Sequence, residues 1–229
     1  VYKRQRDNIF YTSSETAPPA LSKLSAAHPP EYAAFFVHLR KDYIFHCTNM
    51  DAEIIIKWGF IGCGEVTEKK SGPAFSLVPG SKIEAVMSRN KEKARSYAER
   101  HGIPKWYTDA QELVDDPDVN AVYIATPPSS HATFAIMAMK AGKPVYVEKP
   151  LAVSYEECCR INRVSQQTGV PCFVAYYRRY LPYFAKVKEL IRSGAIGRVL
   201  NVQIRFAVPP RDLDYNSREL PWRVQRDIA

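Results

Sequence analysis

Residues 54–67 read IIIKWGFIGCGEVT, an apolar run that leads directly into a glycine-containing loop. The run has the length and composition of a buried strand, and a helix is predicted from about residue 66 to 77. In a strand–loop–helix context, glycines let backbone N–H groups approach a dinucleotide pyrophosphate, which the helix N-terminus stabilises. Thr67 stands where the fingerprint has its third glycine, and a small side chain can still pack helix against strand there. The sequence therefore predicts a dinucleotide site formed by Gly62, Cys63, Gly64, Glu65 and Val66.

Short apolar runs alternate with amphipathic segments as far as about residue 176. Further strands are predicted at residues 83–87, 106–107, 120–125, 144–147 and 172–176. Helices are predicted at residues 91–101, 110–114, 131–141 and from Ser154 to about 168, with Asp109 and Ser154 as N-caps. Strands separated by helices favour a parallel sheet with right-handed crossovers. The predicted fold is α/β, a doubly wound parallel Rossmann sheet over residues 50–176.

The pattern changes after residue 176. A helix is predicted at residues 182–193 and a longer alternating strand at 199–206, followed by a polar, turn-rich segment at 209–228. One helix and one strand cannot enclose a core of their own. We therefore expect residues 177–229 to be the start of a second, α+β domain that is cut short, with residues 199–206 as an exposed edge.

Residues 1–49 differ in character from the rest of the chain. They contain two Pro-Pro pairs and no glycine, and no strand–turn–helix pattern frames their apolar stretch. Val1–Gln5 resemble the translation of a transposon end used in sequencing libraries, which suggests that residues 1–5 are adaptor-derived and 6–49 translated upstream sequence. Recovery of that codon run from genomic DNA would overturn this hypothesis. The alternative is a genuine disordered extension.

Composition excludes several classes of protein. The formal net charge of +8 is spread along the 229 residues, which favours a solvated surface over nucleic-acid binding. No apolar run approaches membrane-spanning length, and the N-terminus has no secretory signal pattern. The odd number of cysteines, without paired metal spacing, predicts reduced thiols in a cytoplasmic protein and no metal site. These cysteines are Cys47, Cys63, Cys158, Cys159 and Cys172.

The end of the second predicted strand indicates which dinucleotide is bound. An acidic residue there would accept hydrogen bonds from the ribose hydroxyls and repel a 2′-phosphate. The sequence instead has Ser88 and Arg89, with Lys93 one turn later, while Glu84 lies too early, inside the strand. A hydroxyl and two cations suit a phosphate, so NADP is favoured over NAD. Alternatively, Arg89 and Lys93 only solvate the start of a helix.

Two later strand ends face the same predicted edge. Thr126, Pro127 and Pro128 form a stiff loop that can lie along the ribose and nicotinamide, with His131 packing or hydrogen-bonding near them. The alternative for His131 is a helix residue without a ligand role. Lys149 ends the next strand, where its amine can relay the proton of a substrate hydroxyl. The alternative for Lys149 is a surface lysine that pairs with Glu148.

Taken together, these motifs resemble the glucose–fructose oxidoreductase/inositol dehydrogenase (Gfo/Idh/MocA) family. The resemblance rests on Gly62-Cys63-Gly64, Thr126-Pro127-Pro128 with His131, Glu148-Lys149-Pro150, and Arg179 with Pro182. It implies that Lys149 lies beside the nicotinamide and takes part in proton transfer, and that Arg179 lies near the cofactor and substrate. Trp222-Arg223 resembles a cofactor-contacting pair of the 1,5-anhydrofructose reductase-like branch, which uses NADP.

The resemblance also implies a reaction. The complete protein is expected to transfer a hydride between NADP and a sugar, polyol or related carbonyl compound, and to form a homo-oligomer through its C-terminal sheet. The family continues into a glycine-rich turn and then an Asp and a His or Tyr, which this chain lacks, so we expect the fragment to be inactive. The alternative is a non-catalytic cofactor sensor, similar to the galactose-regulon repressors that lack the lysine.

Overall fold

Six parallel strands form one sheet in the order β3-β2-β1-β4-β5-β6. This computed structural model describes residues 55–207 and 209. The strand order reverses between β1 and β4, as in doubly wound dinucleotide-binding sheets, so the predicted fold class is confirmed. The strands are β1 Ile56–Ile61, β2 Ser81–Met87, β3 Lys105–Tyr107, β4 Ala121–Ile124, β5 Val145–Val147 and β6 Cys172–Val174.

Helices connect the strands, and three of the described helices begin at a residue whose side chain caps them. The Asp109 carboxylate accepts a hydrogen bond from the Gln111 N–H at 2.7 Å, and the Ser154 hydroxyl accepts one from Glu157 at 3.2 Å. Both predicted N-caps are therefore confirmed. The helices are η2 Thr67–Ser71, α2 Gly72–Leu77, α3 Lys91–His101, α4 Ala110–Asp115, η3 Pro128–Ser130, α5 His131–Lys140, α6 Tyr155–Thr168, η4 Tyr177–Tyr180 and α7 Pro182–Arg192.

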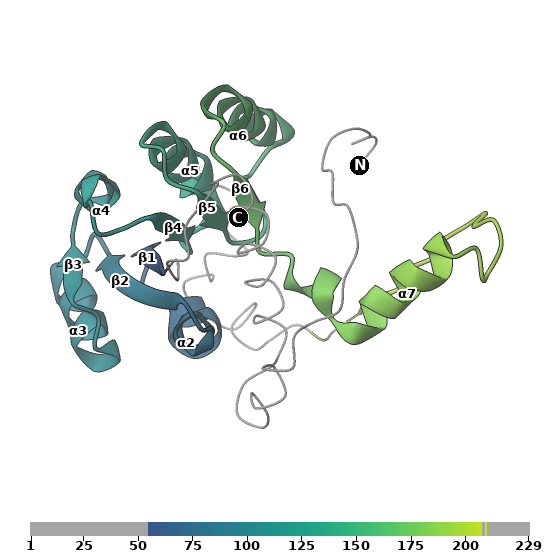
Figure 1. Cartoon of the computed structure of the whole chain (residues 1–229), viewed down its shortest axis with the longest axis horizontal. Coiled ribbons are helices and arrows are strands. Elements are labelled where there is room, and N and C mark those ends of the chain that lie inside the picture. Colours follow the sequence, from purple (N-terminus) through teal and green to yellow (C-terminus); the bar gives the residue numbers. More distant parts are fainter. Residues whose placement is uncertain (1–54, 208, 210–229) are drawn as a thin grey trace. The chain divides into compact units, whose positions relative to one another are not determined.

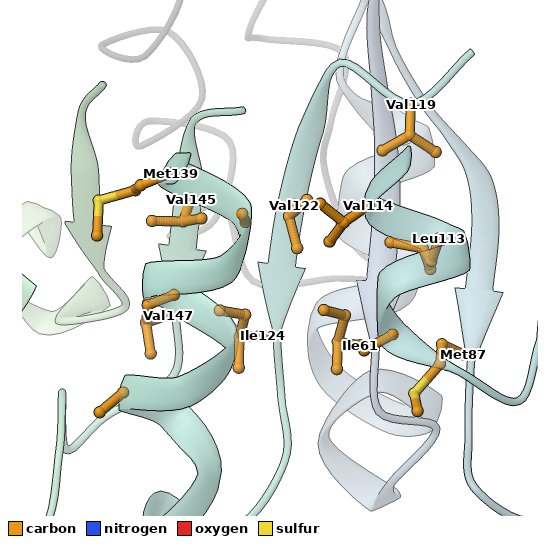
Figure 2. Close-up of a cluster of buried hydrophobic side chains, with 14 of the residues drawn as sticks. Ile61, Met87, Leu113, Val114, Val119, Val122, Ile124, Met139, Val145 and Val147 are labelled. Atoms are coloured by element: carbon orange, nitrogen blue, oxygen red, sulfur yellow. The ribbon is translucent and has the colours of Figure 1, made fainter. Parts of the chain in front are cut away.

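The two faces of the sheet have different cores. Helices α4, α5 and α6 cover one face and α2 and α3 the other (Figure 1). Successive strand residues point to opposite faces, so Val122 and Ile124 enter the first core and Tyr123 the second. The first core is aliphatic (Figure 2). The second is largely aromatic, and is built around Trp58, Phe60, Phe75, Tyr97, Tyr123 and Tyr146.

Most predicted elements agree with the observed ones to within two residues, but the strand predicted at residues 199–206 is wrong. These residues form no strand, and their apolar side chains are exposed, with Ile204 86% and Leu200 81% accessible. A strand requires a neighbouring backbone for its hydrogen bonds, and none of the described residues pairs with this segment. The predicted extension, residues 1–49, lies outside the described residues, and so does most of 209–228. No helix in the described segments combines the length and apolarity needed to cross a membrane.

The helix predicted at residues 66–77 contains an unexpected wide turn. In η2, a π-helix, the Gly72 N–H donates to the carbonyl of Thr67, five residues back. Pro73 explains the change, because proline has no N–H and its ring would clash with the carbonyl of Lys69 in a continuous α-helix. Interrupting the helix places Pro73 in the first turn of α2, where proline is tolerated. The wide turn also leaves Ser71 facing the interior, only 1% exposed.

Gly72 tests this packing. Glycine-to-alanine changes within helices usually stabilise by about 1 kcal/mol. At Gly72 a Cβ would lie 2.2 Å from the Thr67 carbonyl oxygen and 2.9 Å from the Tyr97 hydroxyl. We therefore predict the opposite sign: Gly72→Ala lowers the free energy of unfolding by about 1–3 kcal/mol, measured by urea denaturation. A stabilised variant would contradict the tight turn.

Candidate active site

Three predicted loops meet at the carboxyl edge of the sheet. The Ala125 N–H donates to the carbonyl of Ile61 at 2.9 Å, and the Glu148 N–H donates to that of Ile124 at 2.9 Å. The ends of β1, β4 and β5 are thereby joined side by side. The glycine loop, the Thr126–Pro127–Pro128 loop and the Lys149 turn, which comprises residues 148–150, consequently line one edge of the sheet.

The glycine loop leaves room for a ligand on one side and none on the other. Gly62 has φ +114°, and a Cβ on it would lie 2.8 Å from the Ala125 carbonyl oxygen. At Gly64, in contrast, a Cβ would meet nothing closer than that same oxygen at 4.0 Å. Gly62 is thus required by the fold itself. The open side of Gly64, at the start of a helix, fits the close approach of a pyrophosphate.

Thr67 fits the position of the third glycine. Its side chain is completely buried, and its hydroxyl donates to the Gly64 carbonyl at 2.8 Å. The threonine therefore links the glycine loop to the helix by a hydrogen bond. The nearby carboxylates have partners: Glu65 pairs with Lys69 at 3.1 Å, and Glu68 pairs with Arg100 and contacts a ring nitrogen of His101. The hydrogen bond from Arg100 lowers the pKa of Glu68.

Cys63 can contribute only its backbone to such a site. Its thiol is buried and lies 3.5 Å from the Met87 carbonyl oxygen. Burial raises the pKa of this thiol to about 11, so it is a neutral, unreactive group at physiological pH.

The predicted NADP-selecting residues lie just beyond β2. Ser88 accepts a hydrogen bond from the Asn90 N–H at 3.3 Å, and Asn90 caps α3 by accepting from Lys93 N–H at 2.8 Å. Arg89 and Lys93 are both exposed, and neither forms an ion pair with another described residue. Their charges are therefore available to an anion at this corner of the sheet.

The structure places His131, which is expected to pack or hydrogen-bond near the ribose and nicotinamide, in the interior of the domain. The ring is 1% exposed. Its Nδ1 lies 2.8 Å from the carbonyl oxygen of Pro150, and its Nε2 lies 2.8 Å from that of Thr126. Both ring nitrogens are thus engaged with backbone groups. His131 joins the Thr126–Pro127–Pro128 loop to the Lys149 turn, and its place near the ribose and nicotinamide stays a prediction.

The Lys149 turn contains a second buried connection that sequence reasoning missed. Lys149 is exposed, and its peptide bond to Pro150 is cis. The Tyr123 hydroxyl donates to Glu148 Oε1 at 2.7 Å and lies 2.9 Å from the Ser71 hydroxyl. Alternation along β4 could have shown that Tyr123 faces the core, but no sequence signal pairs it with Glu148.

Other predicted residues are less constrained. Arg179 is exposed on η4, which follows β6, the strand next to the Lys149 strand. Trp222 and Arg223 lie outside the described residues. Within the described residues, no cluster of histidine, cysteine or carboxylate side chains could hold a metal ion. A cavity of about 370 Å³ lies elsewhere, between α2, β2 and the end of α3, and contains none of the predicted site residues.

Comparison with known proteins identifies the family. A model described as an oxidoreductase family with an NAD-binding Rossmann fold matches residues 56–176. The chain belongs to the Gfo/Idh/MocA family. It is 42% identical over 174 residues to oxidoreductase P35 of Formosa agariphila, covering 76% of this chain and 54% of that protein. It is also 36% identical over 143 residues to scyllo-inositol 2-dehydrogenase (NAD(+)) of Bacillus subtilis, covering 62% of this chain and 42% of that one.

Solved structures agree with this assignment. A 3-ketoreductase from Actinomadura kijaniata, in complex with NADP and TDP-benzene, superimposes with a TM-score of 0.57 at 28% identity. The match covers 61% of this chain and 43% of that one. The chain spans about half the length of the curated relatives that it matches.

The His131 contacts lead to a stability prediction. In the complete protein, His131→Leu leaves a buried backbone carbonyl without its hydrogen-bond donor and should lower the free energy of unfolding by roughly 2–3 kcal/mol. His101→Leu is the matched control, because the polar contact of His101 is with Glu68 at the surface, Glu68 retains Arg100, and leucine can still pack against Tyr97; it should cost less than about 1 kcal/mol. Denaturant unfolding of both variants measures the difference, and equal losses would contradict the assignment.

Proposed function

We propose that the complete protein is an NADP-dependent oxidoreductase that transfers a hydride between the nicotinamide and a sugar, polyol or related carbonyl compound. The observation that carries this proposal is the alignment of the glycine loop, the Thr126–Pro127–Pro128 loop and Lys149 along one sheet edge. In parallel α/β sheets, ligands bind outside the carboxyl ends of the strands where the strand order reverses. Lys149 follows β5, the strand next to β4 at that reversal.

Each group at this edge has a distinct role in the proposal. The backbone of Gly62, Cys63, Gly64, Glu65 and Val66 holds the pyrophosphate, while Thr126, Pro127 and Pro128 border the ribose and nicotinamide. His131 positions those loops. When the cofactor is bound, its nicotinamide supplies the hydride acceptor or donor. In the oxidation of a substrate alcohol, the Lys149 amine would accept the hydroxyl proton, and in the reduction of a carbonyl compound it would return that proton.

The cofactor preference rests on Ser88, Arg89 and Lys93. Two exposed cations without ion-pair partners among the described residues, and no carboxylate at the end of β2, favour a 2′-phosphate over a free diol. The similar proteins include both kinds: the Bacillus subtilis relative is named for NAD(+), and the Actinomadura kijaniata enzyme was crystallised with NADP. We therefore treat NADP as the preferred cofactor and NAD as the alternative.

Substrate recognition is assigned to residues 177–229 and the second domain that they begin. Arg179, Trp222 and Arg223 are proposed to approach the cofactor and substrate from that side. A sugar or polyol is supported by the relatives' names, which include scyllo-inositol 2-dehydrogenase and D-xylose dehydrogenase. Cytoplasmic location and homo-oligomerisation belong to the same proposal.

Replacing Lys149 tests the proposed chemistry. In the complete protein, Lys149→Ala should lower kcat roughly 100-fold or more, because it removes the proton acceptor, while the NADPH dissociation constant changes little. Lys140→Ala removes an exposed lysine at the C-terminal end of α5, and it should change neither kcat nor the NADPH dissociation constant. Hydride transfer is followed by NADPH absorbance with a panel of sugars, polyols and ketones. NADPH binding without turnover of any of these compounds would favour the alternative, a non-catalytic cofactor sensor.

The cofactor preference has its own test. Arg89→Ala should raise the NADPH dissociation constant roughly tenfold and leave that of NADH unchanged, because only NADPH carries the phosphate. Arg95→Ala is the control, since Arg95 lies on α3, which follows Arg89, and is already paired with Glu99 at 2.8 Å. Both constants are measured by calorimetric titration. Equal effects on the two cofactors would contradict the assignment of Arg89.

A further inference from the structure

The Glu148 carboxylate is held between two donors. The Tyr123 hydroxyl donates to Oε1 at 2.7 Å, and the backbone N–H of Lys149 donates to Oε2 at 3.3 Å. The carboxylate therefore bridges a fully buried side chain and the backbone of the residue assigned to proton transfer. Tyr123, the buried partner, therefore determines the position of the Glu148 carboxylate.

Tyr123 has almost no freedom to move. Its side chain is completely buried, and its ring packs against Phe60, Phe75 and Tyr146 with centroid separations of 4.9, 4.8 and 5.4 Å. Aromatic rings packed in this way keep a defined orientation. The hydroxyl is thus a fixed point at the boundary between the aromatic core and the carboxyl edge.

The hydroxyl also connects to the helix that follows the glycine loop. It lies 2.9 Å from the Ser71 hydroxyl, which in turn is 3.2 Å from the Val66 carbonyl oxygen. A phenol has one proton, and the carboxylate is the stronger acceptor, so Tyr123 donates to Glu148, while the single Ser71 proton is available either to Tyr123 or to the Val66 carbonyl. Burial, followed by the charge of Glu148, holds the pKa of Tyr123 well above its usual range, so it remains a donor.

Glu148 could serve only as a hydrogen-bond acceptor for the buried Tyr123 hydroxyl. Ser71 alone could do so, because its hydroxyl is within hydrogen-bonding distance and buried. Glu148 is instead partly exposed, and its carboxylate could be hydrated in other rotamers. Its inward orientation is therefore set by Tyr123, and this orientation allows the second oxygen to meet the Lys149 N–H.

We propose that Tyr123 is a positioning residue for the reaction, which holds the Lys149 turn through Glu148 and ties it through Ser71 to the helix of the glycine loop. The proposal rests on the proposed function, in which Lys149 transfers the proton. It implies that removing one buried oxygen from β4 displaces the Lys149 turn without removing any group that touches the cofactor or the substrate.

Tyr123→Phe in the complete protein tests this, because it removes only the hydroxyl. It should lower kcat about tenfold while the KM and the dissociation constant for NADPH stay within about twofold, since the Lys149 amine remains present but misplaced. With NADPH bound, amide hydrogen exchange of residues 148–152 should accelerate at least about threefold. Ser71→Ala should move the exchange in the same direction by a smaller factor, and it serves if Tyr123→Phe does not fold.

Tyr107→Phe is the matched control. The Tyr107 hydroxyl also donates to a carboxylate, that of Asp116 at 3.0 Å, but it does not contact the Lys149 turn. It should accelerate exchange only around residues 105–118 and leave kcat and the exchange of residues 148–152 unchanged.

The outcomes separate the two proposals. If the wild-type protein binds NADPH but transfers no hydride, the proposed function fails, and faster exchange of residues 148–152 in Tyr123→Phe still supports the role of Tyr123 in holding the turn. If Tyr123→Phe keeps full kcat, or if exchange of residues 148–152 is unchanged in both Tyr123→Phe and Ser71→Ala, the positioning role is overturned.

Discussion

Close packing of the Gly62 backbone against Ala125 is the constraint on which the rest of the site depends. The two residues follow β1 and β4, the strands between which the order of the sheet reverses. A side chain at Gly62 would collide with the Ala125 carbonyl, so the two loops can lie together only if this residue is glycine. That contact aligns the glycine loop with the Thr126–Pro127–Pro128 loop, and β5 then adds Lys149 along the same edge.

Hydrogen bonds from buried side chains then give these loops a defined geometry. The ring nitrogens of His131 lie against the carbonyls of Thr126 and Pro150, and the Tyr123 hydroxyl donates to the carboxylate of Glu148. The two carbonyls and the carboxylate belong to loops that follow β4 and β5, where the backbone has few partners of its own. The aromatic core beneath them supplies a rigid support, because its rings cannot shift independently. The loops at this edge are thus placed by a scaffold that is itself closely packed.

Much of this organisation was predictable, because it depends on short-range pattern. Apolar runs located all six strands, and Asp109 and Ser154 marked helix starts by their hydrogen-bonding preferences. The wide turn before Gly72 was not predicted, although Pro73, which cannot continue an α-helix, indicates a break at that point. The strand predicted at residues 199–206 failed because alternation reports a preference for extended backbone, whereas a strand also requires a partner.

The chain's local patterns were therefore sufficient to establish the parallel sheet, the glycine loop and the edge on which Lys149 lies, since chain geometry dictates where successive strands end. Which side chains support that edge was decided by packing between residues distant in sequence. Tyr123 and Glu148 are 25 positions apart and meet only because β4 and β5 pair in one register. His131 was assigned its supporting role in the same way, because burial brought both ring nitrogens against backbone carbonyls.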